Sequence, residues 1–227
     1  PGHEIDLYAV LYPARQVGGD LYDFFIHENT LFFAIGDVSG KGIPASLLMA
    51  STISLLRTLS SGSNSPSQIA YSLNNSIAER NEADMFVTFF IGMLDLRTGV
   101  MKYCNAGHTP PVLTSPDRTV AFFEMQSDLP LGILKNHDYQ EYTYRFVSGS
   151  GILLYTDGVT DAENEKNEFY TRERLLEIVT QNQELHPREF IRSIINDIQS
   201  HIKSHELSDD LSMLTFIYGS EWNIKKS

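Results

Sequence analysis

Basic residues, cysteine and long apolar runs are all scarce in this sequence. Its 227 residues hold 17 Lys and Arg against 29 Asp and Glu, giving a formal net charge of -12 at pH 7. Nucleic-acid binding needs clustered Lys and Arg to neutralise phosphates, so this balance argues against a nucleic-acid partner. The single cysteine, Cys104, excludes an internal disulfide framework and suits a reducing compartment, and we expect the domain to be cytoplasmic.

No apolar run approaches the ~18 residues that a membrane-spanning helix needs. The chain opens at Pro1, with neither an initiator methionine nor a signal-peptide pattern. We therefore expect an excised fragment of a longer protein, and sensor, receiver or membrane-spanning segments elsewhere in that protein are compatible with the sequence. With 42% hydrophobic residues, residues 1–227 are expected to form one domain with a substantial core.

Hydrophobic periodicity predicts ten strands and four helices. Alternating or continuous apolar stretches predict strands at residues 5–11, 21–26, 31–35, 86–94, 100–104, 112–113, 120–123, 139–146, 151–155 and 212–218. Helical spacing predicts helices at residues 44–59, 68–80, 171–181 and 187–203. The segment SSGSNSPS, residues 60–67, is rich in loop formers and predicts the connection between the first two helices.

The order of these elements indicates the fold class. Asp95 and Gly99 bound a short connection that predicts a hairpin between the strands at 86–94 and 100–104. Strands, two helices, many strands, two helices and a final strand follow one another along the chain. This order favours an α+β fold, an antiparallel β-sandwich flanked by helices on both sides.

Aspartates at predicted strand ends carry the functional signal. They occur in four segments: VGGDLYD at 17–23, AIGDVSGKG at 34–42, LLYTDGVTDA at 153–162 and SDDLSML at 208–214. Asp and Gly are ordinary turn residues, which is a sufficient explanation for any one segment alone. Glycine, however, permits close backbone approach, so that a carboxylate and a main-chain carbonyl can both reach an ion. The recurrence of this pattern favours a shared site.

Carboxylates from separate segments would repel one another in a shared site unless cations lay between them. Hard oxygen ligands select Mg²⁺, Mn²⁺ or Ca²⁺, and no Cys/His cluster has the spacing for zinc. Two such ions can share a water, lower its pKa and hold a phosphate for in-line attack. We expect magnesium or manganese and a hydrolytic reaction on a phosphoester.

Other phosphate and hydrolase motifs fail on inspection. GDVSGKG at 36–42 is one residue too short for a nucleotide-binding P-loop and has Gly42 where Ser or Thr is required. No G-x-S-x-G sequence is present. Cys104 is followed by NAGHTPP, without a nearby Arg, so a thiol-phosphate mechanism is poorly supported and a core strand position is expected.

Six segments together resemble the PPM metal-dependent protein phosphatases, in the bacterial branch typified by sporulation stage II protein E and the sigma-factor-regulating phosphatases. They are PARQVGGDLYDFF, AIGDVSGKGIPASLLMA, NAGHTPPVL, LPLGI, LLYTDGVTDA and DDLSML, in the family's order across roughly residues 13–218. The resemblance implies a β-sandwich between two helical layers. It also implies that the chain is the C-terminal catalytic part of a longer signalling protein and removes phosphate from phosphoserine or phosphothreonine on a protein.

The resemblance also implies a ligand set for two Mn²⁺ or Mg²⁺ ions. Asp37 should bridge both metals, with the Val38 carbonyl on one of them. Asp157 and Asp209 complete the coordination, and Asp20 acts mainly through a metal-bound water. Asp209 is preferred over its neighbour Asp210 because it aligns with the first residue of the family's motif.

Three further residues have open alternatives. Asp161 matches a position that contributes to a weaker third metal site, and the alternative is a turn or helix-cap aspartate. Arg15 stands five residues before Asp20, where animal relatives carry a phosphate-binding arginine, and the alternative is a surface arginine. His108 falls where other branches carry an acidic metal-site residue. One alternative is a histidine in an exposed loop at the site, where it acts as an acid or as a hydrogen-bond donor. The other is a structural histidine.

Partners follow from the same resemblance. The expected substrate is a phosphorylated protein, commonly an anti-sigma-factor antagonist of the STAS type. The helix at 44–59 follows Asp37 directly, and in relatives such a helix couples a sensor domain or dimer partner to metal binding; core packing alone also explains its apolar stripe. An upstream sensor or receiver domain and a homodimer are thus compatible with the sequence. A hydrolase of another phosphoester and a pseudophosphatase that binds partners without turnover are the rival functions.

Overall fold

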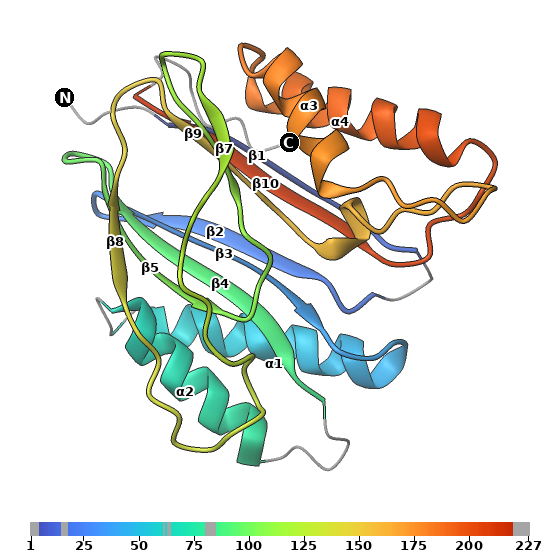
Figure 1. Ribbon diagram of the computed structural model, residues 1–227. Helices are drawn as coiled ribbons and strands as arrows, with labels where there is room; N and C mark the ends of the chain where they lie inside the picture. Colours follow the sequence, from blue (N-terminus) through green and yellow to red (C-terminus); the bar gives the residue numbers. More distant parts are fainter. Residues whose placement is uncertain (1–4, 15–17, 61, 63–64, 80–84, 220–227) are drawn as a thin grey trace. The chain divides into compact units, whose positions relative to one another are not determined.

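The structure, a computed structural model, describes residues 5–14, 18–60, 62, 65–79 and 85–219 (Figure 1). The chain divides into two compact units, and neither is continuous in sequence. The first unit comprises Pro1–Arg15, Thr109–Glu124 and Phe146–Ser227. The second comprises Gln16–His108 and Met125–Arg145. We call them the α3–α4 unit and the α1–α2 unit after the helices that they contain.

The α1–α2 unit is a five-stranded antiparallel sheet with two helices on it. The strand order is β2-β3-β4-β5-β8. The bounds are β2 Leu21–His27, β3 Thr30–Val38, β4 Val87–Asp95, β5 Val100–Ala106 and β8 Tyr142–Arg145. Helix α1 (Ile43–Ser60) packs on β2 and β3, and helix α2 (Pro66–Glu79) packs on β4 and β5. The predicted hairpin between the strands at 86–94 and 100–104 is confirmed, because β4 and β5 pair antiparallel.

Apolar side chains from both helices and one sheet face form the core of this unit. Strands β3 and β4 are buried along almost their whole length, which explains their continuous apolar sequences. Leu73 and Ile69 of α2 and Leu56 of α1 are each no more than 2% exposed within this core. Cys104 lies in the same cluster, so the predicted core strand position of this cysteine is confirmed.

Helix α1 is an exception to the expectation that no segment is long and apolar enough to span a membrane. Its 18 residues reach a mean hydropathy of 1.3, and 22% of them are buried. Core helices of soluble proteins pass the same test of length and composition. Ile43 and Leu47, in its first two turns, are 70% and 64% exposed. The apolar character of α1 is therefore only partly used in the core of its own unit.

The α3–α4 unit is a second five-stranded antiparallel sheet with its own pair of helices. The strand order is β1-β10-β9-β6-β7. The bounds are β1 Ile5–Tyr12, β6 Val112–Thr114, β7 Val120–Phe122, β9 Gly151–Tyr155 and β10 Leu211–Tyr218. Helix α3 (Arg172–Asn182) packs on β7, and helix α4 (Pro187–Ile202) packs on β1 and β10. Strand β1 pairs with β10 from Ile5 opposite Tyr218 to Tyr12 opposite Leu211.

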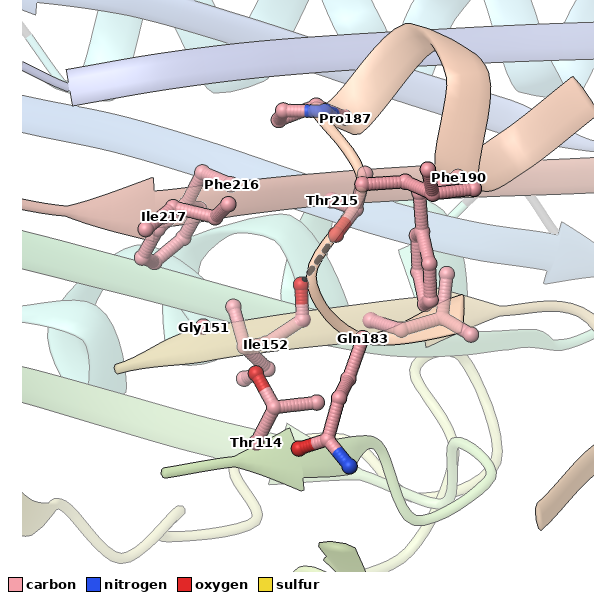
Figure 2. Close-up of a pocket in the computed structure, with 11 residues that line it drawn as sticks. Thr114, Gly151, Ile152, Gln183, Pro187, Phe190, Thr215, Phe216 and Ile217 are labelled. Atoms are coloured by element: carbon pink, nitrogen blue, oxygen red, sulfur yellow. Dashed lines mark hydrogen bonds between the residues drawn. The ribbon is translucent and has the colours of Figure 1, made fainter. Parts of the chain in front are cut away.

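One stripe of α4 supplies much of the core of this unit. Phe190, Ile191, Ile194, Ile198 and Ile202 recur at helical spacing and are all buried. Figure 2 shows a crevice where the start of α4 meets β9 and β10. The crevice has a volume of about 10 Å³, roughly the space of one water. Close packing, rather than a ligand site, is therefore what this region provides.

All ten predicted strands and all four predicted helices are found. The strand predicted at 139–146 is shorter, because only Tyr142–Arg145 pairs with β5. The short 3₁₀ helix η1, Asp157–Val159, was not predicted. The predicted end of the second helix, Arg80, lies outside the described residues. Two antiparallel sheets, each covered by helices, confirm the predicted α+β class.

Burial makes a testable prediction for Cys104. Desolvation, followed by the charges of Asp128 and Glu141, raises the pKa of its thiol to about 12. At pH 8 roughly one thiol in 10⁴ is then ionised, and only the thiolate reacts. We expect Ellman's reagent to label the folded chain at least about 100-fold more slowly than the chain in guanidinium chloride. Rapid labelling of the folded chain would contradict this burial. The Cys104→Ala variant, which has no thiol, gives the background signal of the reagent.

Candidate functional site

The predicted site residues fall on both units. Asp20, Asp37, Val38 and His108 belong to the α1–α2 unit. Asp157, Asp161 and Asp209 belong to the α3–α4 unit. Arg15 lies outside the described residues. The two groups are described separately below.

Asp20 and Asp37 lie at the open end of the β2–β3 hairpin. Leu21 pairs with Gly36, and continuing this antiparallel register by one residue sets Asp20 opposite Asp37. Asp20 is buried, with 2% of its surface exposed. A Cβ atom on Gly19 would lie 3.1 Å from the Val38 carbonyl oxygen and 3.6 Å from Asp37 Oδ1. The absence of a side chain at Gly19 thus leaves a small cradle beside a carbonyl and a carboxylate.

Helix α1 is fixed to the segment that carries Asp20 by two contacts. Near its start, Ser46 Oγ lies 2.9 Å from the Gly18 carbonyl oxygen. Near its end, Arg57 donates to both carboxylate oxygens of Asp23 at 2.6 Å. Gly18 and Asp23 flank Asp20 in the sequence, so α1 holds this segment on both sides. The bidentate pair also explains why the second aspartate of VGGDLYD is buried.

His108 is buried and makes polar contacts with Thr88 and Asn105 of the α1–α2 unit. It is 4% exposed, so its interpretation as an exposed loop side chain is wrong. Its Nδ1 atom lies 3.1 Å from Thr88 Oγ1, and Thr88 is the strand partner of Asp37. Its backbone N–H donates to Asn105 Oδ1, and Asn105 Nδ2 donates back to the His108 carbonyl. Sequence reasoning missed Thr88 and Asn105, because only the strand register reveals them.

In the α3–α4 unit, Asp157 and Asp161 lie on one turn directly after β9. Asp157 starts the 3₁₀ helix, and the backbone N–H of Asp161 donates to its carbonyl at 2.8 Å. The buried Thr160 hydroxyl lies 3.1 Å from the same carbonyl and 3.1 Å from Asp161 Oδ1. Thr160 thus orients the Asp161 carboxylate, a role that sequence reasoning missed.

Gly158 brings this turn against the segment that leads into β10. A Cβ atom on Gly158 would lie only 1.8 Å from the Asp210 carbonyl oxygen, so only glycine fits. The two aspartates before β10 then differ in their contacts. Asp210 is buried and accepts from the Ala14 N–H at 2.9 Å. Asp209 is partly exposed, and its Oδ1 atom accepts from the Asp210 N–H.

The charges around Asp157 identify its neighbours. Desolvation by surrounding protein atoms, and then the negative charges of Asp161 and Asp209, raise the pKa of the Asp157 carboxyl above its ordinary value. Such a group of like charges is relieved by a cation, and oxygen donors suit Mg²⁺, Mn²⁺ or Ca²⁺. Among the described residues, no three His, Cys, Asp or Glu side chains gather closely enough to hold a metal ion. The donor chemistry of each unit nevertheless fits a hard divalent cation.

A protein-family comparison assigns the chain. The sequence profile of Stage II sporulation protein E (SpoIIE) matches residues 27–217, which is most of the chain. The chain belongs to the SpoIIE family. This membership confirms the family that the six sequence segments predicted.

Individual relatives of the family agree with this assignment. Phosphoserine phosphatase RsbU of Bacillus subtilis is 29% identical over 211 residues, which cover 92% of this chain and 62% of RsbU. Protein IcfG of Synechocystis is 29% identical over 235 residues, which cover 91% of this chain and 37% of IcfG. The chain therefore spans less than two thirds of the length of these relatives.

Solved structures of low sequence identity share the fold. The SiaA-PP2C domain of Pseudomonas aeruginosa matches with a TM-score of 0.83 at 17% identity, covering 93% of this chain and 85% of that domain. The PP2C phosphatase domain of SpoIIE from Bacillus subtilis matches with a TM-score of 0.82 at 18% identity, covering 95% of this chain and 64% of that structure. RsbX, solved in complex with magnesium, matches with a TM-score of 0.69 at 18% identity, covering 94% of each chain. The predicted PPM fold is confirmed.

The glycine contacts predict a graded series of stabilities. Gly158→Ala forces a methyl group into the Asp210 carbonyl and should destabilise the fold by several kcal/mol, on the order of a large core substitution. Gly19→Ala meets the Val38 carbonyl less closely and should cost less. Gly62→Ala has open space around it and serves as the matched control. Urea unfolding of the three variants measures their free energies of unfolding. A Gly158→Ala protein as stable as Gly62→Ala would contradict the close approach of Gly158 to the Asp210 carbonyl.

Proposed function

We propose that this chain is a metal-dependent protein serine/threonine phosphatase. The observation that carries the proposal is its membership of the SpoIIE family, together with carboxylates at the ends of strands in both units. Two relatives, RsbU and RsbP of Bacillus subtilis, are named phosphoserine phosphatases. Because the chain spans only part of each, the activity of its own parent protein is part of the proposal.

Divalent ions, Mn²⁺ or Mg²⁺, are the proposed cofactors. The α1–α2 unit would supply Asp37, the Val38 carbonyl and, through a water, Asp20. The α3–α4 unit would supply Asp157 and Asp209, with Asp161 serving a third ion. Two bound ions supply a water of lowered pKa and neutralise charge on the phosphoryl oxygens. Support comes from the oxygen donors of both units and from a relative, RsbX, solved with magnesium.

The contacts of the paired aspartates support Asp209, rather than Asp210, as the ligand. The charge of Asp209 is one of those that raise the pKa of Asp157. The buried carboxylate of Asp210 accepts a hydrogen bond from the N–H of Ala14, which follows β1. Asp210 therefore holds the chain that leads toward Arg15. Its role is to position backbone.

Arg15 is proposed to bind the phosphoryl group, and His108 is proposed to support the substrate-binding site. Arg15 has a planar guanidinium that can donate two parallel hydrogen bonds to phosphoryl oxygens. His108 is held by Thr88 and Asn105, and Thr88 is the strand partner of Asp37. A buried histidine in this place is suited to keeping the neighbouring chain in position and to donating toward the site. We assign it that supporting role rather than direct ligation.

The proposed substrate is phosphoserine or phosphothreonine on a bacterial signalling protein, an anti-sigma-factor antagonist of the STAS type. Its support is the naming of the relatives: a matched structure contains the RsbU and RsbW domains of a Mycobacterium tuberculosis protein, and another belongs to a bacterial stressosome. An upstream sensor or receiver domain, a homodimer and a cytoplasmic location complete the proposal. Residues 1–227 are proposed to act as one catalytic domain.

The rival functions make different predictions. A pseudophosphatase would bind partners without turnover, although a binding module has no physical need for the repulsion that Asp161 and Asp209 exert on Asp157. A hydrolase of another phosphoester would prefer small substrates to a phosphoserine peptide. Both rivals can be separated from the proposed function by the same assay.

Manganese-dependent phosphate release from p-nitrophenyl phosphate and a phosphoserine peptide tests the function. We expect turnover that a chelator removes, and at least about 100-fold loss in Asp37→Asn and in Asp157→Asn, because each removes an anionic ligand. A folded chain that neither releases phosphate nor binds Mn²⁺ in calorimetry would exclude the phosphatase. Mn²⁺ binding without turnover would favour the pseudophosphatase.

The adjacent aspartates offer a matched pair of variants. Asp209→Asn should weaken Mn²⁺ binding by at least about tenfold and leave the urea midpoint nearly unchanged, because it removes a partly exposed ligand. Asp210→Asn should lower the free energy of unfolding by about 1–3 kcal/mol through its buried contact with Ala14. Calorimetry and urea unfolding of both variants give the comparison. The reverse pattern would assign the ligand to Asp210.

A further inference from the structure

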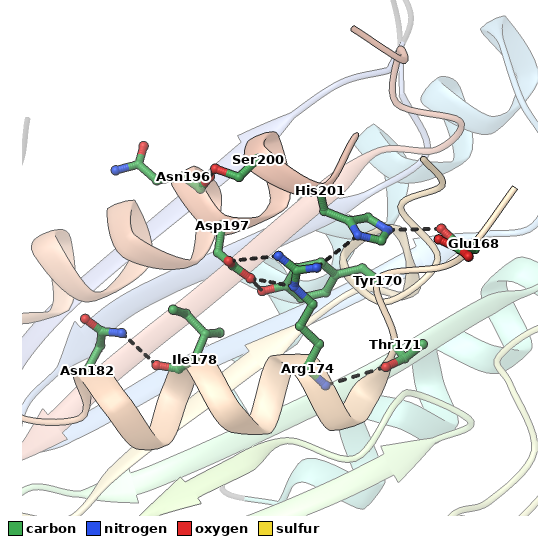
Figure 3. Close-up of polar contacts among 10 residues, drawn as sticks. All are labelled: Glu168, Tyr170, Thr171, Arg174, Ile178, Asn182, Asn196, Asp197, Ser200 and His201. Atoms are coloured by element: carbon green, nitrogen blue, oxygen red, sulfur yellow. Dashed lines mark hydrogen bonds and ion pairs between the residues drawn. The ribbon is translucent and has the colours of Figure 1, made fainter. Parts of the chain in front are cut away.

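A group of side chains joins helices α3 and α4 to the loop between η1 and α3 (Figure 3). Asp197 of α4 accepts from Arg174 Nε at 2.9 Å and Nη2 at 3.0 Å, and from the Tyr170 hydroxyl at 2.6 Å. His201 Nδ1 lies 3.1 Å from Arg174 Nη1, and its Nε2 lies 3.0 Å from the Glu168 carbonyl oxygen. We call Tyr170, Arg174, Asp197 and His201 the Tyr170 clamp.

The protonation states of the clamp follow from its geometry. A guanidinium only donates, so His201 Nδ1 accepts from Arg174 and His201 Nε2 donates to the Glu168 carbonyl. The Arg174 hydrogen bond lowers the pKa of Asp197, and burial raises the pKa of Tyr170. Tyr170 therefore stays a donor and Asp197 a charged acceptor near neutral pH. The hydroxyl of Tyr170, a residue only 1% exposed, ends on a carboxylate rather than in apolar core.

Behind the clamp, the loop folds back on the turn that carries the carboxylates. The Tyr170 N–H donates to the Ala162 carbonyl at 2.9 Å, and the Thr171 N–H donates to the Thr160 carbonyl at 2.9 Å. Glu163 and Phe169 form a bridge between the two arms of the loop. Residues 160–163 thus lie against residues 169–171. A displacement of Tyr170 would move the backbone that follows Asp157.

Strain at Thr171 shows that the loop is held from outside. Thr171 has φ 73° and ψ 158°, a conformation that a β-branched residue rarely adopts. Such a conformation persists only where surrounding contacts over-determine it, and it is enriched at functional sites. Here the contacts on either side are the buried Tyr170 and the start of α3. The same residue, through its N–H, fixes the carbonyl of Thr160.

The last link is the Thr160 hydroxyl. It lies 3.1 Å from Asp161 Oδ1 and 3.1 Å from the Asp157 carbonyl oxygen. One polar chain therefore runs from α4, through Tyr170 and the loop backbone, to Thr160 and the Asp161 carboxylate. None of the clamp residues is itself among the proposed metal ligands.

We propose that the Tyr170 clamp positions the Asp157–Asp161 turn for metal binding, with Tyr170 and Asp197 as positioning residues. This inference rests on the proposed function, because it concerns the metal-binding state of the same turn. Its physical content is preorganisation: carboxylates that repel one another must be held in place before a cation can bind them. Partners one step away from a ligand are known to tune metal affinity in this way.

Two conservative variants and one control test the clamp in the full chain. Tyr170→Phe removes the hydroxyl and keeps the buried ring, and Asp197→Asn removes the charge and keeps the shape. Phe190→Leu is the control, because Phe190 is a buried residue of α4 that lines the crevice with β9 and β10 and has no polar side-chain atom in the clamp. All three should lower stability, but only the first two alter the support of the Asp157–Asp161 turn.

Two readouts are needed, neither of them enzyme activity. Amide hydrogen exchange of residues 157–171, without metal, reports how firmly the loop is held. Mn²⁺ affinity, measured from the electron paramagnetic resonance signal of free Mn²⁺, reports how well the carboxylates bind the ion. At a temperature well below every unfolding midpoint, we expect Tyr170→Phe and Asp197→Asn to speed exchange about tenfold and to weaken Mn²⁺ binding roughly three- to tenfold. Phe190→Leu should leave both quantities at the wild-type values.

The possible outcomes separate this proposal from the proposed function. Unchanged exchange in the two clamp variants, or faster exchange with unchanged Mn²⁺ affinity, would overturn the positioning role while the phosphatase stands. Equal effects in Phe190→Leu would also overturn it, because general destabilisation would then suffice. A wild-type chain that binds no Mn²⁺ overturns the proposed function and the metal-binding role of the clamp together.

Discussion

The approach of one backbone to another at Gly158 is the constraint on which the geometry of the α3–α4 carboxylates depends. No side chain fits between the turn after β9 and the Asp210 carbonyl. Asp157 and Asp209 are consequently near enough for their charges to interact, and Asp161 follows on the same turn. In the other unit, Gly19 likewise leaves space beside the Val38 carbonyl and Asp37 because it has no side chain. In both units, glycine creates the space and the strand ends supply the oxygen atoms.

Electrostatic repulsion is the cost of this arrangement, and the two units offset it by fixing the chain around the acids. In the α1–α2 unit, helix α1 holds the segments on both sides of Asp20 through Gly18 and Asp23. In the α3–α4 unit, the Tyr170 side chain is bonded to Asp197 after the acidic turn, and the Asp210 carboxylate next to Asp209 is bonded to Ala14. Charged groups that do not bind metal thus provide the framework for those proposed to do so.

Sequence reasoning recovered most of the fold because its signals are local. The ten strands and four helices follow from period and from turn residues, both of which lie within a few positions of one another. The short η1 turn escaped because a 3₁₀ helix of three residues has no periodicity. The strand at Tyr142–Arg145 was predicted too long, because apolar residues on either side of it pack without pairing. The apolar pattern of a sequence indicates which residues are buried, whereas hydrogen bonding to a neighbouring strand decides where a strand ends.

The site was predictable only in part, for the same physical reason. The aspartates and glycines stand in short recognisable segments, and family membership supports that reading. Thr88 and Asn105 carry no such signal, because their importance comes from a strand register that sets Thr88 opposite Asp37. The clamp residues are likewise separated along the chain and meet only through the packing of α4 on α3. Residues that position a ligand through contacts formed only in the fold are hard to recognise in a single sequence.

The pairing of β1 with β10 has a consequence for synthesis of the protein. Ile5 is opposite Tyr218, so the hydrogen bonds between β1 and β10 can form only after β10 has been synthesised. The α1–α2 unit has no such requirement, since Gln16–His108 and Met125–Arg145 are complete long before then. That unit can therefore begin to fold earlier in translation, whereas the sheet that carries Asp157 and Asp209 closes only once β10 has been made. The carboxylates of that sheet are therefore brought together later than those of the α1–α2 unit.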